Sequence, residues 1–288
     1  MTTLQSSVRA SAMRAGVNRG LIEFRQLWTN FEDVLGQVVF MLLFLGTVFF
    51  MRNAQLPGTT VSLGATTVPG ILGAGVVFNG LQGAAGYLTI DREDGTLLRA
   101  KSTPNGMLGY LVGKIVTLSL GQVISVLVVL IPCQFLFPVL APDGVWSYLH
   151  LAWVLALGMV AAMPIGAAIG SLITNPRSIG LVVLPIMGLG AISGIFYPIT
   201  ALPVWVQDIA QVFPMYWLGL GMRSALLPDS AVAIEIAQSW RTLPTLGVLA
   251  AWSVLGLALA PVLLRRMARR ESGSSVAARR ERAMQRVG

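Results

Sequence analysis

Side chains that could take part in chemistry are rare in this sequence, and the densest group lies between residues 91 and 104. The segment begins with acidic residues, continues with basic ones and closes on Pro104. This order suits the dipole of a helix, and a proline commonly ends one. Leu97 and Leu98 supply an apolar face, so a short helix held rigidly here could transmit force from a soluble partner. An ordinary solvated loop helix explains the same pattern, and the residues alone leave both interpretations open.

A second group consists of neutral polar side chains within apolar stretches. Asn79 and Gln82 are three residues apart and would share one face of a helix, while Gln122 and Ser193 follow later in the chain. Each could contact a substrate, or could hydrogen-bond to a neighbouring helix, which is the commoner role of such groups in a membrane. We take these four residues as a candidate substrate path. Because its surroundings are almost uncharged, an amphipathic or lipidic substrate fits it better than an ion does.

Several kinds of catalytic site are disfavoured by composition. The chain has one histidine, His150, and one cysteine, Cys133, which argues against a histidine-based metal site and excludes an internal disulfide. A pair of Ser193 and His150 is conceivable, but His150 is predicted near the outer end of the fourth apolar span, and we consider this pair unfavoured. A nucleotide-binding loop needs Gly-x-x-x-x-Gly-Lys-Ser/Thr, and the nearest match, which starts at Gly109, is one residue short and lacks the hydroxyl. We therefore expect no ATPase site and no cofactor on this chain.

The elements that must position these residues are long apolar helices. Of the 288 residues, 55% are hydrophobic and only 11% are charged, against about 25% charged in a typical soluble domain. Apolar runs of roughly 20 residues can each cross a bilayer as a helix. We expect an all-α integral membrane protein with a six-helix domain over residues 34–264. The predicted spans are 34–51, 68–90, 107–131, 148–173, 178–199 and 243–264.

The distribution of positive charge predicts the orientation of these spans. If the N-terminus is inside, 17 of the 20 Lys and Arg residues fall in inner segments, and only Arg52, Arg223 and Arg241 fall in outer ones. Inner loops of membrane proteins collect Lys and Arg, so both ends are expected in the cytoplasm and the protein in the cell's inner (plasma) membrane. The same rule accounts for the net charge of +8 without a nucleic-acid partner.

Two flanking segments and three glycine patterns complete the organisation. In residues 1–33, Leu21, Phe24 and Trp28 recur at helical spacing, as in an amphipathic helix lying in the inner interface, although an extension of the first span is equally compatible. Residues 265–288 form an Arg-rich cytoplasmic tail that anionic lipid would attract. Glycines four apart allow close helix packing, within the subunit or in a dimer. They occur at Gly109 and Gly113, Gly166 and Gly170, and Gly190 and Gly194.

The stretch before the last span has a different character. Prolines divide it into pieces too short to span, and its aromatic residues suit a membrane interface. We expect an outer re-entrant helical hairpin over residues 198–242, which protein or a water-filled cavity must shield. The marker residues are Pro198, Pro203, Trp205, Pro214 and Arg223.

In residues 91–104 and in the stretch before the last span, the sequence resembles the ABC-2 type transporter permeases. These are the membrane subunits of ATP-binding-cassette exporters, including the daunorubicin-resistance type. One family pattern is an acidic, Gly-Thr-containing segment that ends in Thr-Pro, here Glu93 to Pro104. The other is a Ser-Gly, Pro, Leu-Pro, Pro, Arg signature, here between Ser193 and Arg223. Order and topology agree over nearly the whole chain. Met215, Tyr216 and Trp217 depart from the smaller polar residues of many relatives.

The resemblance implies a complex of two permeases, identical or related, and two ABC ATPase subunits that hold ATP and Mg²⁺. It also implies outward movement of a drug, lipid or glycoconjugate. The inner segment would be the coupling helix that docks on the ATPase. Its implied contact residues are Asp91, Arg92, Glu93, Asp94, Gly95, Thr96, Leu97, Leu98, Arg99 and Lys101.

The alternatives are an ion-coupled secondary transporter and an intramembrane enzyme. The first usually needs ionisable groups within the spans and often an inverted repeat. The second needs a metal-binding or acid–base constellation. The scarcity of such residues counts against both.

Overall fold

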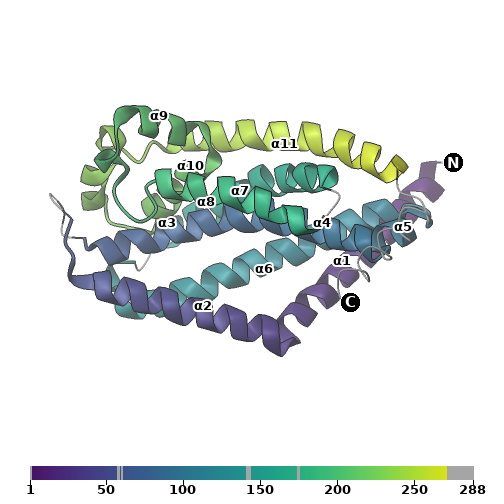
Figure 1. Cartoon of the computed structure of the whole chain (residues 1–288), viewed down its shortest axis with the longest axis horizontal. Helices are drawn as coiled ribbons and strands as arrows, with labels where there is room; N and C mark the ends of the chain where they lie inside the picture. Colours follow the sequence, from purple (N-terminus) through teal and green to yellow (C-terminus); the bar gives the residue numbers. More distant parts are fainter. Residues whose placement is uncertain (1, 57–58, 60, 141–143, 174–175, 271–288) are drawn as a thin grey trace.

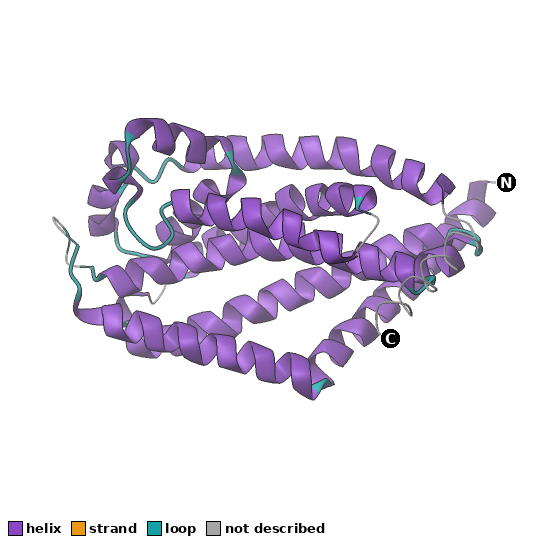
Figure 2. Cartoon of the chain, in the orientation of Figure 1, coloured by secondary structure: helices purple, strands orange, loops and turns teal. Residues whose placement is uncertain are grey.

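The structure, a computed structural model, describes residues 2–56, 59, 61–140, 144–173 and 176–270. It is 88% helical, and no strand occurs among the residues described (Figure 2). The predicted all-α fold is therefore confirmed. The α-helices are α1 (Thr2–Thr29), α2 (Phe31–Phe50), α3 (Leu63–Phe78), α4 (Ala84–Glu93), α5 (Thr96–Lys101), α6 (Gly106–Leu136), α7 (Val145–Leu172), α8 (Gly180–Ile192), α9 (Val204–Val212), α10 (Pro214–Leu226) and α11 (Thr242–Arg270).

Shorter helical turns join these helices. A π-helical turn, η2 (Asn79–Gly83), links α3 to α4 and makes one continuous helical segment of the two. The remaining turns are the 3-10 helices η1 (Met51–Asn53), η3 (Pro138–Leu140), η4 (Pro176–Ile179), η5 (Ile199–Ala201), η6 (Asp229–Ile234) and η7 (Ile236–Gln238).

By length and composition, five segments in the described part of the chain can cross a bilayer. They are Val34–Asn53, Leu63–Glu93, Gly106–Leu136, Val145–Leu172 and Thr242–Arg269. The sixth predicted span, 178–199, contains the shorter helix α8, which ends at Ile192 after 13 residues. At about 1.5 Å per residue, a helix of this length is shorter than the roughly 30 Å hydrocarbon core. Gly194, with φ +64°, turns the chain after α8.

The helices run roughly side by side, with different features at the two ends of the molecule (Figure 1). At one end α9 and the start of α11 lie together, and at the other end α5 lies near the start of α1. Helix α1 is separate from α2, because the Asn30 side chain caps α2 by accepting a hydrogen bond from the Glu32 amide at 3.3 Å. The first turn of α2 then sets off at an angle to α1 (Figure 1).

The largest buried cluster surrounds α10. Every residue of this helix except Ser224 is buried, and Tyr216, Leu218 and Leu220 have no accessible surface. Helix α3 approaches it so closely that a methyl group at Gly73 would collide with the backbone of Gly219. A short helix that does not span is tolerated at membrane depth only under such cover. The hairpin expected over residues 198–242 remains a prediction, and around α10 the packing would meet this requirement.

Candidate functional site

The mixed-charge segment, residues 91–104, forms the end of α4, a turn and the short helix α5. Helix α4 ends at Glu93, and Gly95 adopts φ +79°, a left-handed conformation that favours glycine. The Asp94 carboxylate then accepts a hydrogen bond from the Thr96 amide at 2.7 Å, which helps to start α5. Arg99 and Lys101 occupy the last turn of this six-residue helix. The predicted acidic-to-basic order is thus divided between two helices, with the acidic residues at the end of α4 and in the turn.

Leu97 anchors α5 to the rest of the bundle. Its side chain is 1% exposed and belongs to a cluster with Leu88, Tyr110, Ala260 and Leu264. Burial of a leucine side chain contributes about 1.5–3 kcal/mol. These residues come from α4, α6 and α11, so a displacement of α5 would act directly on three long helices.

A network of ion pairs lies directly behind this segment. Lys114 Nζ lies 2.9 Å from Asp91 Oδ2 and 2.9 Å from Glu23 Oε2. Arg19 Nε is 2.8 Å from Glu23 Oε1, and the Tyr110 hydroxyl donates to Asp91 Oδ2 at 2.8 Å. A single lysine of α6 therefore joins a carboxylate of α4 to a carboxylate of α1. The sequence singled out Asp91 as a contact residue, but it did not connect Asp91 with Lys114 or Glu23.

The implied contact residues of this segment do not all face outward. Asp91, Arg92, Gly95 and Leu97 are buried, and Arg92 Nη1 donates to the Ile173 carbonyl at 2.7 Å, beyond the last turn of α7. The exposed members are Asp94, Arg99 and Lys101, and the partly buried ones are Glu93, Thr96 and Leu98. A partner could therefore bind the exposed and partly buried side chains, while the four buried residues hold the segment in place.

Beside this surface, a cleft of about 500 Å³ separates α1 from α5. Arg19 and Arg99 line it from opposite sides, together with Tyr110 and small residues of α1 and α6.

Helix α1 packs against α6 through glycines. Added methyl groups at Gly16 and Gly20 would collide with the carbonyl oxygens of Gly109 and Gly113. The Thr117 hydroxyl on α6 also donates to the Gly20 carbonyl at 3.1 Å. The predicted packing role of the α6 pair is thus within the subunit. Its partner pair escaped notice in the sequence, although Gly16 and Gly20 have the same spacing of four.

The other two glycine pairs differ from each other. Gly166 and Gly170 of α7 lie against the backbone of Gly80 and Ala85, where a methyl group would collide. Gly190 has only ordinary contacts, at 3.7 Å or more.

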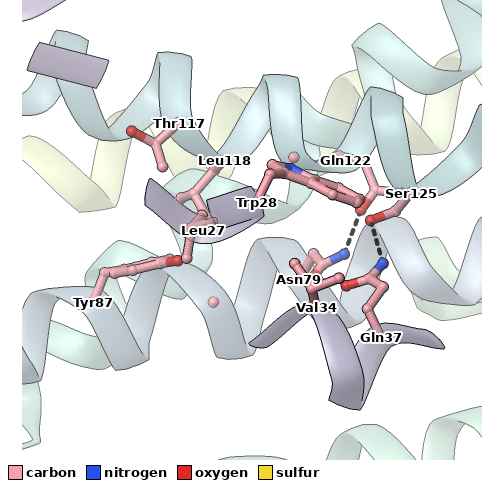
Figure 3. A pocket seen from close by; sticks show the side chains of 12 residues that line it. Leu27, Trp28, Val34, Gln37, Asn79, Tyr87, Thr117, Leu118, Gln122 and Ser125 are labelled. Carbon is pink, nitrogen blue, oxygen red and sulfur yellow. Dashed lines mark hydrogen bonds between the residues drawn. The ribbon is translucent and has the colours of Figure 1, made fainter. Parts of the chain in front are cut away.

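Two of the four neutral polar candidates meet at a cavity of about 260 Å³ (Figure 3). Asn79 Nδ2 donates to Gln122 Oε1 at 2.7 Å, which joins η2 to α6. Gln37 of α2, which the sequence analysis did not single out, donates to Ser125 Oγ at 3.3 Å beside this pair. A polar residue four positions into a predicted span was the only sequence signal for it.

Gln82 and Ser193 do not line this cavity. Gln82 lies on the same π-helical turn as Asn79, but its Oε1 is buried and accepts no hydrogen bond from the described residues. Ser193 is fully buried, and its hydroxyl donates to the Leu189 carbonyl at 2.6 Å. His150 lies 3.0 Å from Ser224 Oγ rather than near Ser193. Within the described ranges, no three His, Cys, Asp or Glu side chains form a group that could hold a metal ion.

At the end of the molecule opposite α5, Arg223 joins the start of the predicted outer signature, at Gly194, to its own end of that signature and to Glu235. Its Nε lies 2.5 Å from Glu235 Oε1, and Nη1 donates to the Gly194 carbonyl at 3.2 Å. Both charged side chains are 3% exposed, and a buried charge normally requires such a partner. Glu235 was not anticipated, because nothing in its local sequence distinguishes it.

The marker prolines of this region each begin an element. Pro198 precedes η5, Pro203 precedes α9, and Pro214 is the first residue of α10. Proline is favoured at the first helical position, since its missing N–H would have no partner there. Trp205 on α9 is 68% exposed, and its contact with a membrane interface remains a prediction.

No curated protein matches the chain, but a protein-family model does. The family model described as ABC-2 family transporter protein matches residues 51–261, well over half of the chain. The match begins after α2 and includes the mixed-charge segment, most of the cavity-forming helices, α10 and α11 as far as Pro261. Together with five helices capable of crossing a bilayer, it establishes that the chain is a multi-pass membrane protein and belongs to the ABC-2 family of transporter proteins.

Proposed function

We propose that this chain is the permease subunit of an ATP-driven exporter that moves an amphipathic or lipidic substrate outward. Two copies of a separate ABC ATPase subunit supply the energy, and a second permease, identical or related, completes the pathway. Six segments cross the plasma membrane, the shortest being α8 lengthened by the preceding turn η4, and both ends lie in the cytoplasm. The region around α9 and α10 enters the outer leaflet as a re-entrant hairpin.

The observation that carries this proposal is the construction of the mixed-charge segment in a chain of this family. Helix α5 presents Arg99 and Lys101 to solvent, while Leu97 and the Lys114 ion pairs fix its inner side. An exposed, short and rigidly anchored helix suits the transfer of force, because displacement is passed on rather than absorbed. When the ATPase pair binds ATP and closes, α5 moves and carries α4, α6 and α11 with it.

The distribution of charge supports the orientation. Exposed basic residues of α5 lie at the same end as the last turns of α11, where Leu264 contacts the α5 cluster. The positive-inside rule places that end in the cytoplasm. A cysteine in place of Lys101 should react with an impermeant thiol reagent only from the cytoplasmic side, and one in place of Trp205 only from outside. Labelling of both from the same side would refute this orientation.

Ion-coupled transport is the less favoured alternative. The ionisable side chains Glu23, Asp91 and Lys114 pair with one another near one end of their helices, whereas proton or sodium carriers place such groups within the spans. Transport that collapses with the proton gradient and continues without ATP would favour this alternative.

The direct test is purification of the tagged permease in mild detergent, followed by ATPase measurement of whatever co-purifies. An ABC ATPase should accompany the wild-type chain and lose its permease-dependent activity with Arg99→Glu and Lys101→Glu together. Arg52→Glu, a charge reversal at the opposite end, is the matched control and should leave the activity intact. Absence of any ATPase, or full activity in the double variant, would overturn the proposal.

A further inference from the structure

The cavity shown in Figure 3 lies where the N-terminal helix meets the first span. Leu27 and Trp28 near the end of α1 line it, as does Val34 in the first turns of α2. Its other walls are η2, α4 and α6. Thr117 links it to the ion-pair network, since the hydroxyl lies 3.5 Å from Glu23 Oε2. The cavity therefore lies next to the anchored end of the mixed-charge segment, on the inner side of the membrane in the proposed orientation.

The lining carries hydrogen-bonding groups but no charged side chain. Asn79 and Gln122 each use one end of their amide in their mutual hydrogen bond. The other ends, Asn79 Oδ1 and Gln122 Nε2, form no hydrogen bond with the described residues. Gln37 has the same arrangement, because its Nε2 donates to Ser125 while its Oε1 stays unused. Donors and acceptors thus remain available to a ligand.

The local backbone helps to create this space. A π-helical turn carries one more residue per turn than an α-helix, and such turns often occur at functional sites. Here it is Asn79–Gly83, and Asn79 faces the cavity from its first position. Opposite it, Gly121 of α6 has no atom within 4 Å of where a methyl group would lie, so the space beside Gln122 stays open.

The chemistry and volume of the cavity together select a class of ligand. An ionised group would lose its hydration there without gaining an opposite charge, which is costly. A neutral group with several hydroxyl or amide functions would find partners. The volume of about 260 Å³ is below the roughly 300–1,000 Å³ of pockets that enclose a whole drug-sized ligand. It therefore suits a headgroup, with the alkyl chains left outside in lipid.

We propose that Gln37, Asn79, Gln122 and Ser125, with Trp28, form an inner-leaflet subsite that binds the uncharged, hydroxyl-rich headgroup of an amphipathic substrate. This inference rests on the proposed function for the word substrate, but the binding itself does not require an ATPase. Trp28 supplies a flat apolar face of the kind on which a sugar ring stacks, and the amides supply hydrogen bonds that fix its orientation.

The test is photolabelling of the full-length permease in liposomes without ATPase or nucleotide. The probe is a dodecyl glucoside with a diazirine near its glycosidic carbon, and dodecyl phosphate with the same diazirine is the anionic comparison. We expect the glucoside to label peptides from the end of α1, the start of α2 and α6, and unlabelled decyl glucoside to compete. Equal labelling by the phosphate, or no labelling of these peptides, would overturn the proposal.

Variants separate specific binding from partition into lipid. Asn79→Leu with Gln122→Leu should lower labelling at this site about tenfold, as expected when two hydrogen-bonding positions are lost. Gln37→Leu removes a single amide and should lower the labelling about threefold. Gln134 lies on α6, as Gln122 does, but its amide donates to the Leu140 carbonyl. Gln134→Leu is therefore the control and should leave labelling unchanged. Unaltered labelling in both the double variant and Gln37→Leu would refute the subsite, whereas the ATPase test above would still stand.

Discussion

Replacement of Lys114 by methionine tests whether one buried cation holds the mixed-charge segment in place. The side chains of Lys114, Asp91 and Glu23 are 13%, 9% and 21% exposed. Methionine retains the length and the apolar stem but removes the charge, and it leaves two carboxylates without their shared partner. Asp91 would keep only the Tyr110 hydroxyl, at 2.8 Å, whereas Glu23 would keep Arg19.

The size of the effect follows from these contacts. Removing one partner of a fully buried ion pair costs about 3–5 kcal/mol. Partial exposure and the remaining Arg19 pair reduce this, so we expect about 2–3 kcal/mol. For a chain of this size the thermal midpoint should fall by roughly 4–12 °C. Stimulated ATPase activity in the complex should fall as well, because α4 and α1 would no longer be joined through α6.

The assay is thermal unfolding in detergent, followed by tryptophan fluorescence, together with ATPase measurement. Lys114→Met combined with Asp91→Asn removes both charges and should recover about half of the lost midpoint. Lys101→Met deletes an exposed lysine of the same segment. It serves as the control for the thermal midpoint alone, because Lys101 belongs to the proposed ATPase contact. A single variant as stable as wild type, or a double variant no better than the single one, would refute the reasoning.

Three further substitutions probe the same region by independent means. Gly20→Ala should destabilise the chain by about 1–3 kcal/mol, since the methyl group would meet the Gly113 carbonyl. Gly46→Ala is the control and should be nearly neutral in thermal unfolding, because nothing lies within 4 Å of the added methyl group. Gly95→Ala forces alanine to φ +79° and should cost about 1–2 kcal/mol while slowing stimulated ATP hydrolysis; an unchanged midpoint would argue against the observed turn. Burial alone would raise the pKa of the Glu23 carboxyl, but hydrogen bonds and charges from its two cationic partners hold the pKa below the usual 4.5. The ion pairs of Glu23 therefore add stability that is complete above about pH 5 and lost as the pH falls through the lowered pKa. The thermal midpoint should consequently decline less steeply between about pH 5 and pH 3 in Glu23→Gln than in the wild type. Equal slopes in the two proteins would contradict this.

Secondary structure was the most accessible feature to sequence reasoning. Runs such as Val34–Asn53 and Gly106–Leu136 are recognisable because a helix must hide its backbone from lipid over about 20 residues. The break at Asn30 and the turn at Gly95 also have local signals, a capping side chain and a glycine. The tail beyond Arg270 lies outside the described residues, so its expected loose association with lipid remains a prediction.

Side-chain partners were much less accessible. The sequence grouped Asp91 with Lys101 as one charged surface, but helix geometry turns Asp91 inward to Lys114 and leaves Lys101 in solvent. Likewise Asn79 and Gln82 seemed equivalent by spacing, yet only Asn79 reaches Gln122. The π-helical turn between them alters the angular relation that a regular helix would give.

The sequence by itself determined the membrane class, the positions of the long helices and the two unusual segments, because hydropathy and charge act locally along the chain. Only the tertiary structure decided that Glu23, Asp91 and Lys114 share one network, that Arg223 joins Gly194 to Glu235, and that Gln37 borders the cavity. These contacts join residues far apart in sequence, and they depend on which helices pack together and on their rotation about their own axes. Neither property is encoded in a local pattern, since long helices such as α6 and α7 carry apolar residues on several faces.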